Sequence, residues 1–156
     1  MGEMDAYKDI FMSESAEFVQ GITDGLLALE SDPGDLEPVE VVFRGAHSLK
    51  GMAAAMGYDR TADLTHKMES LMARVRQRER TADSALIDLM LEAVDMVRVL
   101  IDDESEGRSE VDAAPLLARI VATYSSEKSA GISASAFERV APSQTLKKPM
   151  IPITEN

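Results

Sequence analysis

Apolar residues recur at intervals of three and four along most of this chain, and this spacing constrains the fold more than any other feature. Between residues 36 and 56 the series consists of Val39, Val42, Ala46, Leu49, Ala53 and Met56. An α-helix turns by about 100° per residue, so these side chains form one stripe along one side of a helix. Most of the stability of such a helix comes from covering its stripe with other helices. The sequence therefore predicts an all-α protein.

The same spacing predicts five helices separated by short polar breaks. We expect them at about residues 4–30, 36–56, 59–78, 82–103 and 111–125. On the first helix one apolar face consists of Tyr7, Phe11, Phe18, Ile22, Leu26 and Leu29. After this helix Pro33 and Gly34 break the chain, Asp35 can cap the second helix, and Gly57 can end it in a left-handed conformation. Four long helices with short connections favour an antiparallel up-and-down four-helix bundle, with the fifth helix packed at one end.

The composition excludes several classes of protein. A net charge of −12 argues against binding to nucleic acid or to an anionic membrane surface, because both need clustered Lys and Arg. The chain has no Cys, which excludes thiolate metal sites and suits a reducing cytoplasm. The most apolar segment, 85–101, is interrupted by charged residues and does not resemble a membrane span. We therefore expect a cytoplasmic domain at 4–128, and a flexible linker or tail at 129–156, where Ser, Ala and Pro replace the periodic pattern.

His47 is the strongest candidate for chemistry because it lies outside the apolar stripe of the second helix. It projects about 120° away from the centre of that stripe, and Arg44, Lys50 and Gly51 lie on the same side. The imidazole is therefore expected to be accessible to another protein. The two cations can balance the charge of an incoming phosphoryl group, and the glycine leaves room for that group one turn away.

The third helix carries a second polar pair, His66 and Glu69, outside its own apolar stripe. In an antiparallel bundle this helix is the neighbour of the second, and the turn at Gly57 lies about ten residues from both His47 and Glu69. We therefore expect the Glu69 carboxylate to accept a hydrogen bond from one ring nitrogen of His47. Such a bond fixes the tautomer and leaves the other nitrogen free and more basic, which nucleophilic histidine chemistry requires.

These two segments resemble a known family. Segment 47–58, which begins His-Ser-Leu-Lys-Gly, resembles the phosphorylation-site helix of the histidine phosphotransfer domains that begin chemotaxis kinases of the CheA family. Segment 64–69, Leu-Thr-His-Lys-Met-Glu, resembles that family's next helix, whose His and Glu lie beside the phosphorylated His. The resemblance covers roughly residues 4–125 and includes the number of helices.

The resemblance implies roles for individual residues. It makes His47 the phosphoacceptor and Glu69 its hydrogen-bond partner, with Lys50 and His66 as polar neighbours. Lys67 departs from the family pattern, because members usually have a neutral residue at this position. This departure alters the local charge and leaves the assignment of His47 unchanged.

The implied function is that of a phosphoryl carrier in a two-component chemotaxis pathway. His47 would accept phosphate from the ATP-binding kinase domain of CheA and pass it to an Asp on a response regulator such as CheY or CheB. The chain would be the substrate domain of a protein histidine kinase, without the catalytic domain. It would need no cofactor of its own, because ATP and Mg would be bound by that separate domain.

Two alternatives stay open: a stand-alone phosphorelay protein, and a structural helical adaptor. Other kinds of site lack their sequence patterns. A di-iron bundle needs Glu-x-x-His on two helices, a P-loop needs G-x-x-x-x-G-K-[ST], and a nucleophile elbow needs a strand. Because the apolar stripes are expected to be used inside the bundle, we expect the isolated domain to be a monomer.

Overall fold

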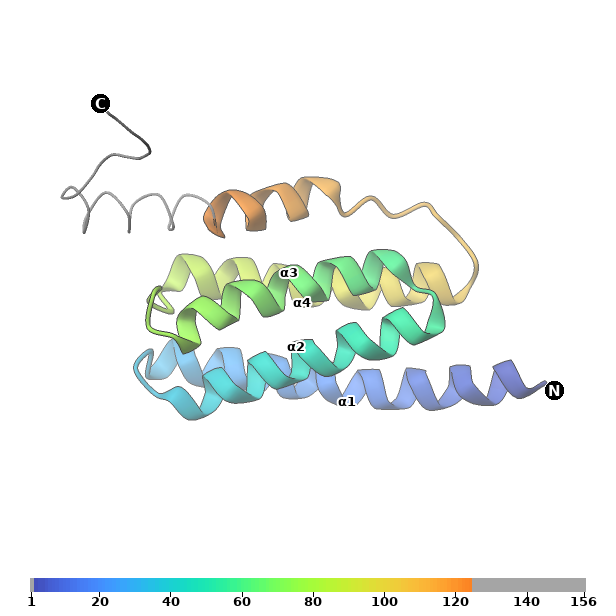
Figure 1. The fold of residues 1–156 in the computed structure, drawn as a ribbon, viewed down its shortest axis with the longest axis horizontal. Coiled ribbons are helices and arrows are strands. Elements are labelled where there is room, and N and C mark those ends of the chain that lie inside the picture. Colours follow the sequence, from blue (N-terminus) through green and yellow to red (C-terminus); the bar gives the residue numbers. More distant parts are fainter. Residues whose placement is uncertain (1, 125–156) are drawn as a thin grey trace, which may run out of the picture. The chain divides into compact units, whose positions relative to one another are not determined.

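The computed structural model describes residues 2–124, and all regular structure within them is helical (Figure 1). The four long helices are α1 (Glu3–Ser31), α2 (Leu36–Met56), α3 (Asp59–Arg76) and α4 (Ser84–Ser105). Residues 114–124 form the fifth helix. The prediction of an all-α fold with five helices is therefore confirmed, and α2 has the bounds that its apolar spacing predicts. The linker or tail expected at 129–156 lies outside the described residues.

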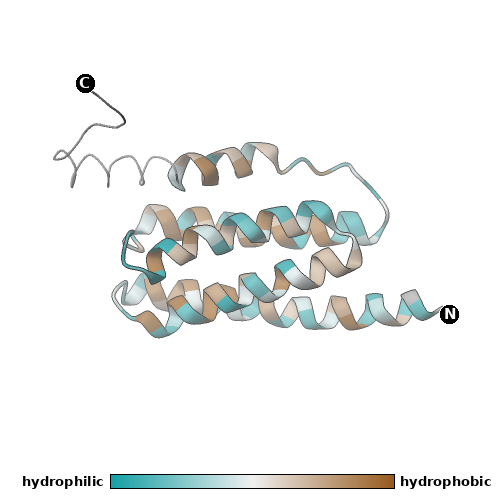
Figure 2. Cartoon of the chain, viewed as in Figure 1, coloured by the Kyte–Doolittle hydropathy of each residue, from teal (hydrophilic) through white to brown (hydrophobic). Residues whose placement is uncertain are grey.

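Helices α1 to α4 pack as a four-helix bundle. Helix α1 contacts α2 and α4, and α3 contacts the same two helices, while short loops reverse the chain between successive helices. Figure 2 shows hydrophobic and hydrophilic residues alternating along each ribbon at helical spacing. The largest fully buried side chains of the shared core are Ile22, Leu26, Leu29, Leu49, Leu64, Met68, Leu71, Met72, Leu86, Ile87, Met90 and Leu100. The predicted up-and-down bundle is confirmed.

Both ends of α2 form as its sequence predicts. At the start, the Asp35 carboxylate accepts a hydrogen bond of 3.1 Å from the Glu37 N–H. At the end, Gly57 has a φ of 77°, and the Tyr58 N–H donates to the Ala53 carbonyl over 2.9 Å. Glycine adopts this left-handed conformation without a steric penalty, so the chain reverses directly into α3.

Helix α3 ends two residues earlier than its predicted end at 78. Arg78 has a φ of 64°, and the Glu79 N–H donates to the Arg74 carbonyl over 2.8 Å, which closes the last turn. This is the same left-handed closure as at Gly57, made by a residue with a side chain. The early end was not predicted because the arginine has no sequence signal for this conformation.

The first turns of α1 differ from the prediction. Tyr7 was expected on the buried face, but it is 52% exposed, and Ile10 is 54% exposed. Figure 1 shows the start of α1 reaching past the turn between α2 and α3, where no neighbouring helix covers it. These two side chains border a shallow hollow that Met52 and Met56 of α2 also line. Some apolar surface is therefore left uncovered, and the expectation of a monomer stays a prediction.

A buried polar cluster joins the start of α3 to the end of α4. The Arg60 guanidinium lies 2.9 Å from the Asp103 carboxylate, which also accepts a hydrogen bond from the Val111 N–H. The Glu104 carboxylate accepts hydrogen bonds from the backbone N–H groups of Arg60 and Thr61. The first N–H groups of a helix have no partner within it, and α3 has no side-chain cap of its own. Glu104 of α4 therefore caps α3.

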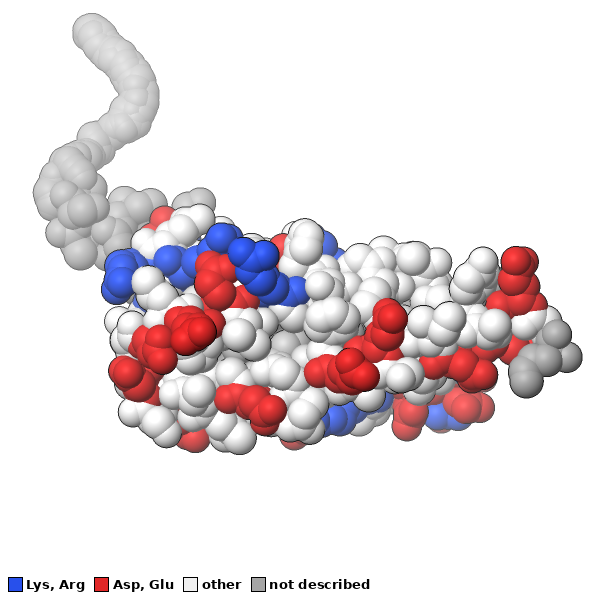
Figure 3. All heavy atoms as spheres, turned by 90° about the horizontal axis from the view of Figure 1, so that it is seen from below, with Lys and Arg blue, Asp and Glu red and all other residues white. Residues whose placement is uncertain are grey.

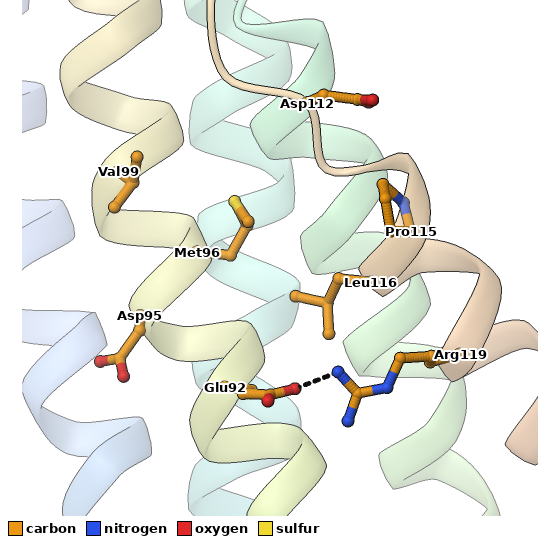
Figure 4. A pocket seen from close by; sticks show the side chains of 8 residues that line it. All are labelled: Glu92, Asp95, Met96, Val99, Asp112, Pro115, Leu116 and Arg119. Carbon is orange, nitrogen blue, oxygen red and sulfur yellow. Dashed lines mark hydrogen bonds and ion pairs between the residues drawn. The ribbon is translucent and has the colours of Figure 1, made fainter.

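The fifth helix lies beside α4. Leu116 and Ile120 are buried in the core, and Arg119 forms an ion pair with Glu92 of α4 (Figure 4). Pro115 lies in the first turn, where its missing N–H is tolerated. A hollow of about 370 Å³ remains between this helix and α4, and its lining residues are labelled in Figure 4.

Helices α1 and α2 approach each other closely at two glycines. A Cβ atom on Gly45 would lie 2.7 Å from Ile22 Cγ1, and one on Gly25 would lie 2.7 Å from Val42 Cγ2. Contacts this short force the neighbouring atoms to move. The close packing of α1 on α2 therefore requires residues without a side chain at these positions.

Gly45→Ala is expected to lower the free energy of unfolding by about 1–3 kcal/mol, because the added methyl group overpacks the contact with Ile22. Urea denaturation measures the change. The matched control is Gly51→Ala on the same helix, where a Cβ atom meets nothing within 4 Å. That variant should be as stable as the wild type or more stable by up to about 1 kcal/mol. Equal losses in the two variants would contradict the close approach.

Asp103 makes the stability depend on pH. Burial raises its pKa, but hydrogen bonds from the Val111 N–H and from the Arg60 and Arg108 side chains outweigh burial and hold the pKa below its ordinary value. A lowered pKa in the folded state adds stability above the ordinary Asp pKa of about 3.9, and this stability is lost as the pH falls through the folded-state pKa.

We expect Asp103→Asn to lower the melting temperature at pH 7, because the arginines lose their charged partner. Below about pH 4 the difference from the wild type should shrink, since the wild-type carboxyl group then becomes protonated. Thermal unfolding followed by circular dichroism at several pH values measures both effects. A difference in melting temperature that stays constant from pH 7 to pH 3 would count against this role of Asp103.

Candidate functional site

His47 lies on the side of α2 that faces α3, and its side chain is 62% exposed. Its ring atom Nδ1 lies 2.6 Å from Oε2 of Glu69 on α3. The hydrogen bond between these two residues, expected from their spacing about Gly57, is therefore present. Since a carboxylate only accepts hydrogen bonds, the proton of a neutral imidazole lies on Nδ1, and Nε2 keeps its lone pair.

The Glu69 carboxylate is shared between two basic side chains of α2. While Oε2 contacts His47, Oε1 lies 2.7 Å from Lys50 Nζ, and the Glu69 side chain is only 12% exposed. Burial raises the pKa of Glu69, but the hydrogen bonds from Lys50 and then from His47 outweigh burial and hold the pKa below its ordinary value. Glu69 is therefore a carboxylate at neutral pH and fixes the tautomer of His47.

The imidazole also lies beside an aromatic ring that the sequence analysis did not single out. The ring of Phe43, one turn earlier on α2, is nearly parallel to that of His47, with 9° between the planes and 6.5 Å between the centroids. The Arg76 guanidinium of α3 lies over Phe43, 4.6 Å from its centroid. Arg76 also pairs with Glu40. The only sequence signal for this arrangement is the four-residue spacing of Phe43 and His47.

Cations gather around the imidazole although the chain carries a net charge of −12. Figure 3 shows Lys and Arg concentrated at one end of the face drawn, with Asp and Glu spread over the rest. Around the imidazole Arg44, Lys50 and Arg76 pair with two carboxylates, Glu40 and Glu69. This surplus of positive charge suits a site that receives an anion.

The other predicted site residues lie around the imidazole in different ways. Arg44 is exposed and pairs with Glu40 over 3.1 Å. Gly51 borders open space, as expected. His66 is exposed, and within residues 2–124 neither a hydrogen bond nor an ion pair joins it to His47, so its role stays a prediction. Lys67, which departs from the family pattern, pairs with Asp63 on its own helix.

The described part of the chain shows neither a metal-binding cluster nor a membrane-spanning helix. Residues 2–124 contain no group of three or more His, Asp or Glu side chains placed to hold a metal ion. None of the described helices is both long and apolar enough to span a membrane. The hollow in Figure 4 is lined by residues of α4 and of segment 112–119. None of its lining residues belongs to α2 or α3.

Comparison with known proteins defines the class. The model of the Hpt domain family matches residues 6–99, which include all of α2 and α3 and most of α1 and α4. The chemotaxis protein CheA of Bacillus subtilis is 42% identical over 112 residues, which are 70% of this chain and 17% of that protein. For CheA of Halobacterium salinarum the identity is 38% over 109 residues, which are 70% of this chain and 16% of that protein. The chain belongs to the Hpt domain family.

Similar solved structures narrow the assignment from the Hpt domain family to the phosphotransfer domains of CheA. The CheA phosphotransferase domain from Thermotoga maritima is similar with a TM-score of 0.62 and 36% identity, over 65% of this chain and 96% of that chain. A solution structure of the histidine phosphotransfer domain of CheA is similar with a TM-score of 0.69 and 33% identity, over 77% and 92% of the two chains. This protein is thus a histidine phosphotransfer domain related to that of CheA, and it spans less than a fifth of the two CheA proteins named above.

Glu69→Ala should lower the population of the Nδ1–H tautomer of His47, because the hydrogen bond that selects this tautomer is lost. Nitrogen-15 NMR of the imidazole at pH 8 reports the tautomer. Phosphorylation of His47 by a CheA kinase core should slow by at least about tenfold. Asp63→Ala is the matched control, since Asp63 is an exposed acid of the same helix that pairs with Lys67. An unchanged tautomer in the Glu69 variant would mean that its carboxylate does not control the ring.

Proposed function

We propose that this domain is a phosphoryl carrier and that His47 is its phosphoacceptor. The single observation that carries the proposal is the contact of 2.6 Å between His47 Nδ1 and the Glu69 carboxylate, whose side chain is only 12% exposed. It leaves Nε2 as the nucleophilic atom of an exposed ring. A histidine nucleophile needs this combination of neutrality, orientation and access.

The chemistry follows from the two ring nitrogens. Nε2 attacks the γ-phosphorus of an ATP molecule bound by another domain, a P–N bond forms, and the bond to the leaving ADP breaks. The ring gains positive charge as the P–N bond forms, and the adjacent Glu69 carboxylate stabilises this charge. Lys50 keeps Glu69 ionised, and Gly51 leaves open space one turn beyond His47.

In the second transfer an Asp carboxylate of a response regulator, of the CheY or CheB kind, attacks the phosphorus. An O–P bond forms, the P–N bond breaks, and Nε2 regains its lone pair. The domain contributes orientation and charge placement, which are the main protein contributions to phosphoryl transfer. ATP and Mg belong to the kinase domain in this proposal, and the setting is the cytoplasm.

An apolar hollow between α1 and α2 supports a role in binding other proteins. It is bordered by the exposed Tyr7 and Ile10 of α1 and by the half-buried Met52 and Met56 of α2. Apolar side chains that cluster at the surface are typical of a site that partners contact. The partners in this proposal are the kinase domain and the regulator.

The test is to mix the chain with a CheA kinase core and ATP labelled in the γ-phosphate. We expect acid-labile, alkali-stable label on the wild type and none on His47→Gln, with unchanged helical circular dichroism. Arg98→Gln is the control, because Arg98 pairs with Asp95 on α4 outside the site, and it should keep its label. Label that persists in the His47 variant would overturn the assignment.

Two further outcomes separate the alternatives. A chain that the kinase core does not label, but that takes up phosphate from a phosphorylated regulator, would be a stand-alone phosphorelay protein. A chain that neither protein labels would be a structural adaptor. The close spacing of His47, Glu69 and Lys50 favours a carrier, because an adaptor has no need of an oriented imidazole.

A further inference from the structure

We propose that Phe43, held in place by Arg76, is a positioning residue that fixes the plane of the His47 ring. The inference rests on the proposed function of His47 and concerns how its reactive atom is aimed. Phe43 lies nearly parallel to the imidazole and one turn before it on α2, whereas Glu69 reaches Nδ1 from α3. The arrangement involves side chains from both α2 and α3.

The hydrogen bond to Glu69 leaves one motion of the imidazole free. It restrains the distance between Nδ1 and Glu69 Oε2, but the two side-chain torsions of His47 can still change together and tilt the ring. Such a tilt moves Nε2, the other ring nitrogen. Since in-line transfer needs the attacking lone pair to point at the phosphorus, Nε2 requires a second constraint.

The flat face of Phe43 supplies this constraint. With 9° between the planes and 6.5 Å between the centroids, the two rings are nearly parallel and within the range of aromatic pairs. Phe43 is half-buried, so its own ring is held by the protein. A large tilt of the imidazole toward Phe43, which precedes it by one turn on α2, would bring the two rings into collision.

Phe43 is itself held by contacts across the helix interface. The guanidinium of Arg76 lies 4.6 Å from the centroid of its ring, within the range of a cation–π interaction. Glu40, one turn before Arg44 on α2, pairs with both arginines, one on each carboxylate oxygen. Glu40 thereby fixes the guanidinium of Arg76 over Phe43. Glu40 therefore positions Arg76, Arg76 positions Phe43, and Phe43 positions the ring of His47.

The test uses the full chain with two substitutions of Phe43. Phe43→Leu keeps an apolar side chain but removes the flat face, and Phe43→Tyr keeps the face. We expect kcat for labelling by a CheA kinase core to fall about tenfold in the leucine variant, with KM for the chain unchanged, and to recover in the tyrosine variant. Phe18→Leu is the matched control, because Phe18 is also half-buried but lies on α1. It should leave kcat unchanged.

A second measurement is independent of the kinase. Carbon-13 relaxation of the His47 ring should give a lower order parameter in Phe43→Leu than in the wild type and Phe18→Leu. Arg76→Gln should shift kcat and the order parameter in the same direction by a smaller amount. Its control is Arg98→Gln, since Arg98 is an arginine of similar exposure that pairs with Asp95 on α4.

The outcomes separate the two proposals. If the wild type takes up no label, the proposed function fails, and ring order alone decides whether Phe43 positions His47. If the wild type is labelled but Phe43→Leu keeps both kcat and ring order, the role of Phe43 is wrong. Equal losses in Phe43→Leu and Phe18→Leu would also overturn it, because they would show a general effect of core packing.

Discussion

Gly57 ends α2 in a left-handed conformation, and the reversal at this residue sets the register between α2 and α3 on which the site depends. His47 precedes the turn and Glu69 follows it at a similar distance, so the two side chains meet across the interface at 2.6 Å. A shift of α3 by one residue would rotate the carboxylate by about 100° away from the imidazole. The apolar stripes oppose such a shift, because it would expose core residues on the same helix.

The fold holds this register at both ends of the hairpin. Near the turn, Glu104 of α4 caps the first N–H groups of α3, and Arg60 joins α3 to the buried Asp103. At the far end, Arg76 of α3 pairs with Glu40 of α2. Polar contacts between helices are directional, whereas apolar packing alone tolerates small displacements. The polar contacts therefore fix the register between α2 and α3, and with it the geometry of the site.

The charged side chains around His47 have two different roles. Glu69 is half-buried, ionised and shared by His47 and Lys50, so it acts on the ring and its proton. Arg44 and Arg76 share Glu40 at the surface, and the two arginines exceed this one carboxylate in charge. A carrier must accept a phosphoryl group and also release it. Neighbouring cations that are already paired with carboxylates attract this group without binding it irreversibly.

The sequence by itself determined the helices, the bundle and the central contact of the site. Apolar spacing defines α2, and the similar separations from Gly57 are enough to bring Glu69 to His47. The sequence did not determine the exposure of Tyr7, because burial there depends on how far the neighbouring helices extend. Nor did it indicate that Arg76 would lie over Phe43. Spacing along one helix is a local property, whereas contacts between helices depend on their relative rotation, which only the packing of the whole core decides.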